Sequence, residues 1–511
     1  MSVQFATRVP VPSTVTPAQG ADVPDGCGDD LAARLAAGPG LWEDWLGELR
    51  RSGLIEELLQ DGTIARAAAQ ADHGHKLDRA LTAEVTAMCV LAGALFPEQG
   101  YDLILARVFG MPGVPVKPGT AVPSGPALSK ARMLLGEAVM RRAFDIDAAR
   151  DDIGPGEDGT VFGMEATAFD GTTLEVFANE ELAAEFGVPE GGTKPKIRIV
   201  ALVQTGTRRW KAAEVGGYTD GENALVDQME TSLGEGMVNF ADRGFFSMDR
   251  WKRFSATGAH LIWRVKNGKK SVPFKVTETL SDGSELVRLH ESNAMLGKRR
   301  RGAGDKKLAR HPDMTARLVT FTVLTRTARG RVKSTQIRVL TTLLDPDVCP
   351  SSEIAASYAR RWQIEIAFLH LKKTLRGTGR TLRGRSVTLV RQEAWALLLV
   401  HNMIAALASR AIAAAGRNPG TVSYLAVLSL VRSHVDSDAC CRHCGRRPTA
   451  ASDPLAQLIA AILAQPAGRT GRKRTSGRTP AERRSWHTEP VDYTITIVPS
   501  NLPNVATSPA S

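Results

Sequence analysis

The sequence contains little cysteine and few aromatic residues: 6 of its 511 residues are Cys, and 5% are Phe, Trp or Tyr. Six cysteines in a chain of this length do not form a disulfide framework, so the sequence favours a reduced, cytoplasmic setting over a secreted one. Three of them, Cys440, Cys441 and Cys444, lie beside His443. One C-x-x-C motif without a second pair is weak evidence for a zinc site, so the role of this cluster stays open.

The sequence also lacks a secretory signal and a clear membrane span. Residues 1–26 hold no apolar core of the signal-peptide kind. Leu81–Phe96 is too short to cross a bilayer comfortably, and Ala394–Ala415 contains His401 and Arg410. We expect both stretches to be buried helices of a soluble protein that has no membrane partner.

Acidic residues are in the minority, with 54 Asp and Glu against 65 Lys and Arg and a formal net charge of +11. The surplus is concentrated in Glu285–Lys333, which has 13 basic and 4 acidic residues, and in Arg469–Arg484, where Glu482 is the one acid among seven Lys and Arg. Such charge favours a polyanion such as nucleic acid, although a basic surface also serves solubility. The second stretch is rich in Gly, Thr and Pro and predicts a mobile arm along DNA phosphates.

Length and periodicity indicate several domains, since about 150 residues per domain predicts three or four. From Leu41 to about Ala148, apolar residues recur at three- and four-residue spacing, which indicates helices. From Val161, short β-rich runs alternate with helices, which indicates an α/β sheet domain. The expected order is a flexible leader (1–40), a helical N-terminal DNA-binding domain (41–150), a first core part (160–267), a basic β insertion (268–338), a second core part with a long helix (339–420) and a helical and basic tail region (421–511).

One helix of the N-terminal domain carries basic residues. Ala127–Phe144 follows a Pro/Gly-rich stretch and contains Lys130 and Arg132. A short basic helix after a turn can enter a DNA groove. It can equally be an ordinary amphipathic helix with a solvated face, and the sequence leaves both interpretations open.

Two acidic residues stand where apolar β runs end. Asp170 follows Phe169 and precedes Gly171, and Asp242 follows the run Met237–Ala241. A carboxylate at the end of a strand in an α/β sheet points into the crevice where such folds place their sites. One such Asp alone is usually a turn residue.

A third acidic residue lies on a polar helix stripe. The stripe runs along the predicted helix Ser351–Leu375 and consists of Tyr358, Arg361, Glu365 and Lys372. Their offsets of 0, 3, 7 and 14 residues fall within an arc of about 60°. Apolar residues flank the stripe on both sides, so we expect it to lie in a crevice. The alternative is a solvated face on which Arg361 and Glu365 form an i,i+4 pair, which explains neither the Tyr nor the Lys.

Three carboxylates suit phosphoryl transfer. Two metal ions about 3.5–4 Å apart activate a water or a 3′-hydroxyl and stabilise the leaving oxygen. Mg²⁺ prefers carboxylate, water and phosphate oxygens. A carboxylate-rich centre repels DNA unless basic residues surround it, and Arg361, Lys372 and Arg376 lie on the same helix as Glu365. Tyr358 offers a hydrogen bond to a phosphate.

Taken together, these motifs resemble the insertion sequence four (IS-four) family of DDE transposases. The family signature Y-x2-R-x3-E-x6-K is met without a gap by the four residues of the stripe. The Asp-Gly-Thr at Asp170 and the Asp-Arg-Gly-Phe-Phe-Ser at Asp242 resemble the two Asp motifs of the family. The resemblance covers about residues 41–415.

The resemblance implies a fold, a chemistry and partners. The fold is a ribonuclease-H-like α/β catalytic core with a β-strand insertion, preceded by an all-helical N-terminal domain. Asp170, Asp242 and Glu365 would bind two Mg²⁺ ions, with Mn²⁺ as a substitute. The partner would be double-stranded DNA, as terminal inverted repeats and as target, held by a homodimer in a synaptic complex at the nucleoid. The expected DNA contacts are Tyr358, Arg361, Lys372, Arg376, Arg264, Lys130 and Arg132.

A hairpin intermediate and two rival functions stay open at this point. Some relatives use an aromatic residue of the insertion to hold a flipped base while a DNA hairpin forms. Here no Trp lies between Trp263 and Trp362, and Trp263 is more often a core residue. The rival functions are a catalytically inactive or repurposed DNA-binding protein of transposase origin and a ribonuclease-H-like nuclease without strand transfer.

Overall fold

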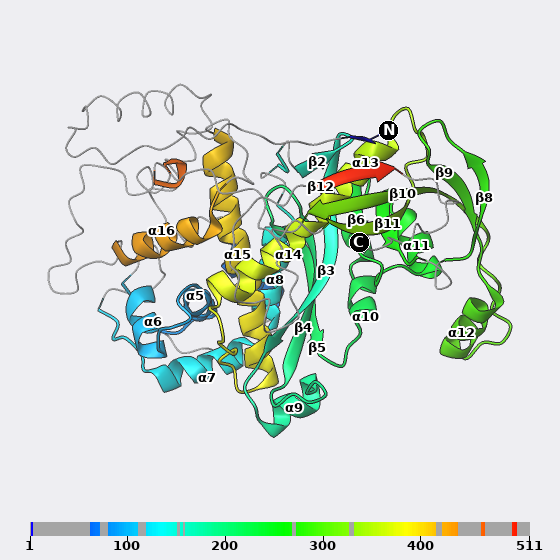
Figure 1. The fold of residues 1–511 in the computed structure, drawn as a ribbon. Coiled ribbons are helices and arrows are strands. Elements are labelled where there is room, and N and C mark those ends of the chain that lie inside the picture. The colour runs from blue at the N-terminus through cyan, green and yellow to red at the C-terminus, as the bar shows by residue number, and fades with distance from the viewer. Residues whose placement is uncertain are drawn as a thin grey trace, which may run out of the picture.

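The structure is a computed structural model that describes residues 2–3, 62–71, 80–110, 119–150, 154–156, 159–267, 272–326, 332–414, 422–437, 461–464 and 493–497. Within these ranges a long mixed sheet is flanked by helices (Figure 1). The first residues of the region predicted to be helical (41–61), the cluster around Cys440 and the basic stretch Arg469–Arg484 lie outside the described residues.

The N-terminal region is helical, as the apolar spacing predicts. α5 (Ala83–Leu95) is buried on nearly every side and begins at Thr82, whose hydroxyl accepts a hydrogen bond from the Val85 backbone N–H. The helix predicted at Ala127–Phe144 is two helices, because Gly136 has a φ of 71° and ends the first of them. The other helices of this region are α4 (Thr63–Gln70), α6 (Tyr101–Val108), α7 (Gly125–Leu135) and α8 (Ala138–Ala148).

Five strands form the centre of the sheet, in the order β5-β4-β3-β6-β7. β3, β6 and β7 run parallel, whereas β4 is antiparallel to β3 and β5. This mixed sheet with helices on both faces is the expected ribonuclease-H-like α/β core. The strands are β3 (Met164–Glu175), β4 (Lys196–Gln204), β5 (Trp210–Gly217), β6 (Met237–Ala241) and β7 (His260–Val265), with the short β2 (Thr160–Val161) beside β3.

Alternating side chains of the central strands build two cores, because neighbours in a strand point to opposite faces. Ala168 of β3 and Phe240 of β6 belong to the core under α13 to η5, and Phe169 and Ala241 belong to the core under α10 and α11. The covering elements are α9 (Glu180–Phe186), α10 (Glu222–Asp227), η2 (Glu230–Ser232), α11 (Met248–Ser255), α13 (Ser351–Ser357), η4 (Tyr358–Arg361), α14 (Trp362–Leu369) and η5 (His370–Leu375).

The predicted β insertion is joined to the core sheet. β11 pairs with both β10 and β7, so the sheet continues across the expected boundary at residue 338. β11 pairs along its whole length with β10. The strands here are β8 (Phe274–Thr279), β9 (Glu285–Leu289), β10 (Met314–Arg326) and β11 (Val332–Thr341), with β12 (Tyr493–Ile497) on β10 and β1 (Ser2–Val3), inside the predicted leader, on β12.

The insertion, which was predicted to consist of β-strands, also contains a helix. α12 (Asn293–Ala303) begins after Ser292, whose hydroxyl accepts a backbone N–H of the first turn, and ends at Gly304 in the left-handed conformation. Figure 1 shows α12 at the far end of the insertion, away from the central sheet. This helix has no apolar period in the sequence, because Leu296 is its one buried residue.

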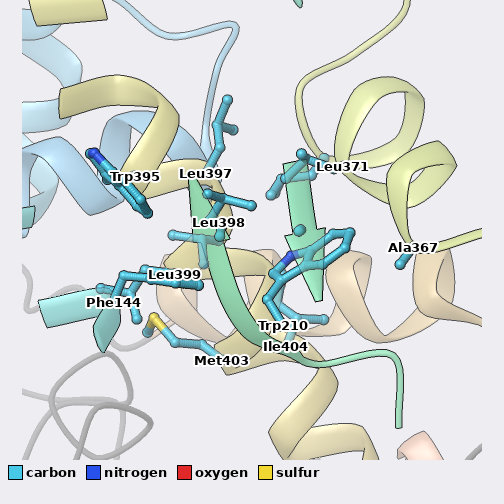
Figure 2. Packing of buried hydrophobic residues seen from close by; sticks show 14 of the residues in the cluster. Phe144, Trp210, Ala367, Leu371, Trp395, Leu397, Leu398, Leu399, Met403 and Ile404 are labelled. Carbon is cyan, nitrogen blue, oxygen red and sulfur yellow. The ribbon is translucent and has the colours of Figure 1, made fainter. Parts of the chain in front are cut away.

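α15 (Val387–Ala414) connects the N-terminal helices with the core, and α16 (Tyr424–Ser437) follows it. Among the described helices, α15 is long and apolar enough over Val387–Ala411 to cross a membrane, but 94% of its most apolar window is buried inside the protein. The two stretches expected to be buried helices are α5 and α15. Figure 2 shows the α15 side chains Leu398 and Ile404 in the core around Trp210 of β5.

Buried polar groups fix the N-terminal helices to the edge of the sheet. Asp147 of α8, Arg209 before β5 and Asn402 of α15 are all buried. Arg209 Nη2 and Asn402 Nδ2 both donate to Asp147 Oδ2, at 3.3 Å and 2.9 Å. Asn402 also exchanges two hydrogen bonds with the backbone of Trp210. Three segments that lie far apart in sequence are therefore joined at one carboxylate.

Candidate active site

Three polar side chains form a row across neighbouring strands: Asp170, Asp242 and Arg264. Ala168, Phe240 and Ile262 are paired across β3, β6 and β7, and each residue of the row lies two positions after one of them. Neighbouring strands are about 4.8 Å apart, so the row is compact. The odd-even alternation puts all three on the face covered by η4 and α14. Arg264 Nη1 lies 3.5 Å from Asp242 Oδ1.

Asp170 lies within β3 and not at its end, which corrects the sequence prediction. Gly171 and Thr172 still pair with β4, and β3 continues to Glu175. Gly171 is a strand residue and not a turn residue, because it pairs with Val200 of β4, and a Cβ there would meet the Glu222 carboxylate at 2.9 Å. Asp242, in contrast, directly follows β6 as predicted.

The predicted helix at 351–375 is a continuous helical run whose pitch changes. It passes from α13 through the 3-10 turn η4 into α14 and ends in the π-helical turn η5. π-Helical turns are rare and frequently occur at functional sites. Glu365 lies in the α-helical part, and Lys372 lies in the π-helical part.

Arg361 brings the helix and the sheet together. Its Nη1 lies 3.8 Å from Asp170 Oδ2, and its Nη2 donates to Glu365 Oε1 at 3.0 Å. The i,i+4 pair considered for the sequence does form, but the Arg361 side chain is only 9% exposed. The solvated-face interpretation of the stripe is therefore wrong, and Asp170 and Glu365 share one guanidinium.

The pKa of Asp170 is raised to about 6. Burial of the carboxyl is the main cause, and the nearby Glu365 and Glu222 carboxylates act in the same direction. The Gly171 N–H, which donates to Asp170 Oδ1 at 2.8 Å, and the Arg361 guanidinium oppose them. Two neighbouring, partly buried carboxylates favour a proton or a cation between them.

Tyr358 is a structural residue in this arrangement, which corrects the expected phosphate contact. Its ring is buried beside Phe240 and Phe321, and its hydroxyl donates to the Ala241 carbonyl at 3.3 Å. Burial raises the pKa of the phenol, so the group stays protonated. Tyr358 therefore holds the end of β6, directly before Asp242.

A cluster of cations lies on the other side of Asp170. Lys372 Nζ donates to Thr172 Oγ1 at 3.0 Å, and Thr172 stands two positions beyond Asp170 on the same face of β3. Burial, followed by the positive charges of Arg376 and Lys196, lowers the pKa of Lys372. The Arg376 Nε and Nη1 atoms are buried without a hydrogen-bond partner among the described residues. These groups together suit an anionic ligand.

Three further sequence predictions have separate outcomes. Lys130 is exposed on α7, so its proposed role stays a prediction. Arg132 is buried and donates to Gln392 Oε1 at 2.9 Å, so it joins α7 to α15 and does not face DNA. Trp263 is fully buried and donates to Asn239 Oδ1 at 2.9 Å, so it is a core residue and not a base contact.

Comparison with known proteins bears directly on these motifs. Residues 162–403 match the family model of the transposase DDE domain, and residues 51–145 match that of the insertion element 4 transposase N-terminal region. The chain belongs to the insertion element 4 family of DDE transposases. This protein is thus a DNA transposase, an enzyme that acts on DNA, and its family depends on divalent metal in general. The resemblance read from the sequence is confirmed.

The transposase is similar to two characterised proteins. Transposase InsG for insertion sequence element IS4, from Escherichia coli (strain K12), is 26% identical over 357 residues, which cover 68% of this chain and 75% of that protein. A cryo-EM structure of a piggyBac transposase synaptic complex with hairpin DNA matches with a TM-score of 0.41 and 10% identity, over 85% of this chain and 89% of its own.

The carboxylates of the transposase site suit a hard divalent cation, although each of them contacts an arginine in this structure. Among the described residues no three potential ligands already converge on one point. Arg361 lies against Asp170 and Glu365, and Arg264 lies against Asp242. The partly buried carboxylates of Asp170 and Glu365 lie close together and are nevertheless the oxygen donors that Mg²⁺ prefers.

Sequence reasoning missed several polar residues beside the transposase site. Lys196, Thr172 and Lys266 have no spacing that marks them, since only the sheet register brings them close. Arg243 could have been found from the sequence, because it directly follows Asp242 in the quoted motif.

Proposed function

We propose that this transposase binds the terminal inverted repeats of an insertion sequence and cuts and rejoins DNA with Asp170, Asp242 and Glu365 as its catalytic carboxylates. The observation that carries the proposal is the contact of one buried guanidinium, that of Arg361, with both Asp170 and Glu365. Asp242 stands beside Asp170 in the same row of the sheet. Three distant chain segments thereby contribute acidic groups to one face.

Two Mg²⁺ ions, for which Mn²⁺ can substitute, are the proposed cofactors. When bound, they supply Lewis-acid chemistry for the attacking and leaving oxygens of phosphoryl transfer. The carboxylates hold this charge, and Asp170 is ionised for that purpose above a pH of about 6. Lys372 and Arg376 hold DNA phosphates next to them, while Arg361 balances the charge of the acidic pair.

The decisive experiment is cleavage of a plasmid that carries the element's own ends, with Mg²⁺ or Mn²⁺, by wild type and Glu365→Gln. We expect metal-dependent cutting at the ends by wild type and none by the variant, while both bind an end duplex equally in a gel-shift assay. Glu222→Gln is the matched control, because this carboxylate lies near Asp170 but pairs with Arg198 at 2.6 Å. It should cut normally.

Other outcomes of the same assay select the rival functions. Binding of the ends without any cutting by wild type would identify a repurposed DNA-binding protein. Cutting without joining of the ends to target DNA would identify a nuclease without strand transfer.

We also propose that two copies pair two DNA ends in a synaptic complex at the nucleoid, in the cytoplasm. The support is the enzyme class, whose substrate is DNA with two ends to be joined. The mass of the complex on end duplexes, measured by light scattering, should correspond to two protomers and two duplexes. One protomer on one duplex under conditions that cut would contradict this.

A further inference from the structure

A cavity of about 200 Å³ opens beside Asp242. It is lined by Arg243, Arg264, Val265, Lys266 and Asn267, here called the Arg243–Lys266 pocket. The lining residues follow or end the parallel strands β6 and β7, so the pocket lies at the carboxyl edge of the sheet, where α/β folds bind ligands.

The pocket carries more positive charge than its surroundings neutralise. Arg264 is partnered by Asp242 at 3.5 Å. Arg243 and Lys266 are exposed, and neither side chain forms an ion pair or hydrogen bond with the described part of the chain. Asn267 Nδ2 donates to the Gln336 carbonyl at 3.0 Å, which fixes the far wall. Two uncompensated cations on a fixed frame attract an anion.

We infer that the Arg243–Lys266 pocket binds a phosphodiester of the DNA strand next to the reacting bond, an inference that rests on the proposed function. A guanidinium presents paired N–H donors and an ammonium presents a point charge, and both suit phosphate oxygens. An extruded base is the other DNA group of suitable size. Such bases stack between aromatic or apolar side chains, and this lining has only Val265 of that kind.

The pocket also gives the DNA strand a path. Lys372 lies beside Thr172, two positions beyond Asp170 on β3, and the Arg243–Lys266 pocket lies beyond Asp242, on the β7 side. Asp170 and Asp242 stand between these positive groups. A DNA strand that contacts both groups therefore crosses the strands of the sheet and passes over the acidic row.

The test combines protein variants with neutral phosphates. Arg243→Gln, Lys266→Gln and wild type are compared on a duplex of the element's end, in which single methylphosphonates replace successive phosphates around the cleavage site. Rates of cleavage and affinities are measured for each pair. One lost charged contact should lower kcat/KM about tenfold. At one position, the methylphosphonate should weaken wild type about tenfold and leave Arg243→Gln unchanged, since both changes remove the same contact.

The matched control is Lys252→Gln, an exposed cation on α11, over the opposite face of the sheet. It should act like wild type at every position. Additive effects at all positions, or full activity of both pocket variants, would overturn the inference. The proposed function would still stand in that case, because wild type cleaves the DNA. If wild type does not cleave, the proposed function fails, and the affinities alone test the pocket: non-additive affinities support it and additive affinities overturn it.

Discussion

At the scale of single residues, one basic side chain of the site contacts two acidic ones. Arg361 serves both Asp170 and Glu365, and the pKa of Asp170 remains raised to about 6 in spite of it. The protein holds this carboxylate in a place that burial makes unfavourable for its charge. Such a group favours whichever positive partner it can obtain, which is the physical basis of a metal-binding role.

The stability of the protein should fall as the pH rises through the pKa of Asp170. Its folded value of about 6 exceeds the ordinary 3.8, so its contribution is fully present below about pH 4 and is lost above pH 6. The loss is about 3 kcal/mol, at 1.36 kcal/mol per pKa unit. Asp170→Asn should therefore unfold at a higher temperature than wild type at pH 8 without metal, and not at pH 4. A lower unfolding temperature at pH 8 would contradict this.

Divalent metal should reverse that order. Mn²⁺ is expected to raise the unfolding temperature of wild type at pH 8, since it binds the folded carboxylates. Asp170→Asn lacks one ligand and should gain clearly less in the same thermal-shift measurement, with Glu222→Gln as the control that gains as much as wild type. Equal gains for all three proteins would remove Asp170 from the metal site.

At the scale of elements, the sequence predicted best where periodicity and chemistry agree. The stripe on 351–375 and the run Met237–Ala241 were found because each combines an apolar pattern with a polar residue at a defined place. β5 was missed because Trp210–Gly217 has no alternating pattern, and its burial comes from α8 and α15. The Arg243–Lys266 pocket could not be predicted, since sheet register and not spacing assembles it.

α12 should act as a separate DNA contact. Glu291 is buried and binds Arg299 at 2.9 Å, which anchors the helix, so the exposed cations beside it point away. These exposed cations are Lys298, Arg301, Lys306 and Lys307. Replacing all four with Gln should lower the slope of log affinity against log salt by up to about 0.9 per contact, or about 3–4 in total. Cleavage of saturated DNA at low salt should not change.

The control for α12 is Lys252→Gln, which should keep the wild-type slope. Salt dependence is read from binding curves on one duplex at several salt concentrations. An unchanged slope for the fourfold variant would show that α12 does not touch DNA phosphates.

At the scale of the whole molecule, the buried carboxylate of Asp147 joins α8 to the edge of the sheet and to α15. Asp147→Asn removes the negative charge that partners two buried arginines, Arg209 and Arg150. Breaking a buried pair in this way costs about 3–5 kcal/mol of the free energy of unfolding. Urea denaturation measures it.

The matched control joins the same two elements at the surface. Arg141 of α8 and Glu214 of β5 form an ion pair of 2.7 Å, in which Arg141 is 46% exposed. Glu214→Gln should cost less than about 1 kcal/mol. Similar costs for the two variants would mean that the buried network does not dominate the attachment of the N-terminal helices.

The wide separation of the acidic residues along the chain has a consequence for biosynthesis. Asp170 and Glu365 are 195 positions apart (365 − 170), and ribosomes add about 5–20 residues per second. About 10–40 seconds therefore pass between the synthesis of the first carboxylate and the last. A chain released in this interval contains Asp170 but not Glu365. Under the proposed function, such an unfinished chain does not cut DNA, so cutting begins only once the chain is synthesised beyond Glu365.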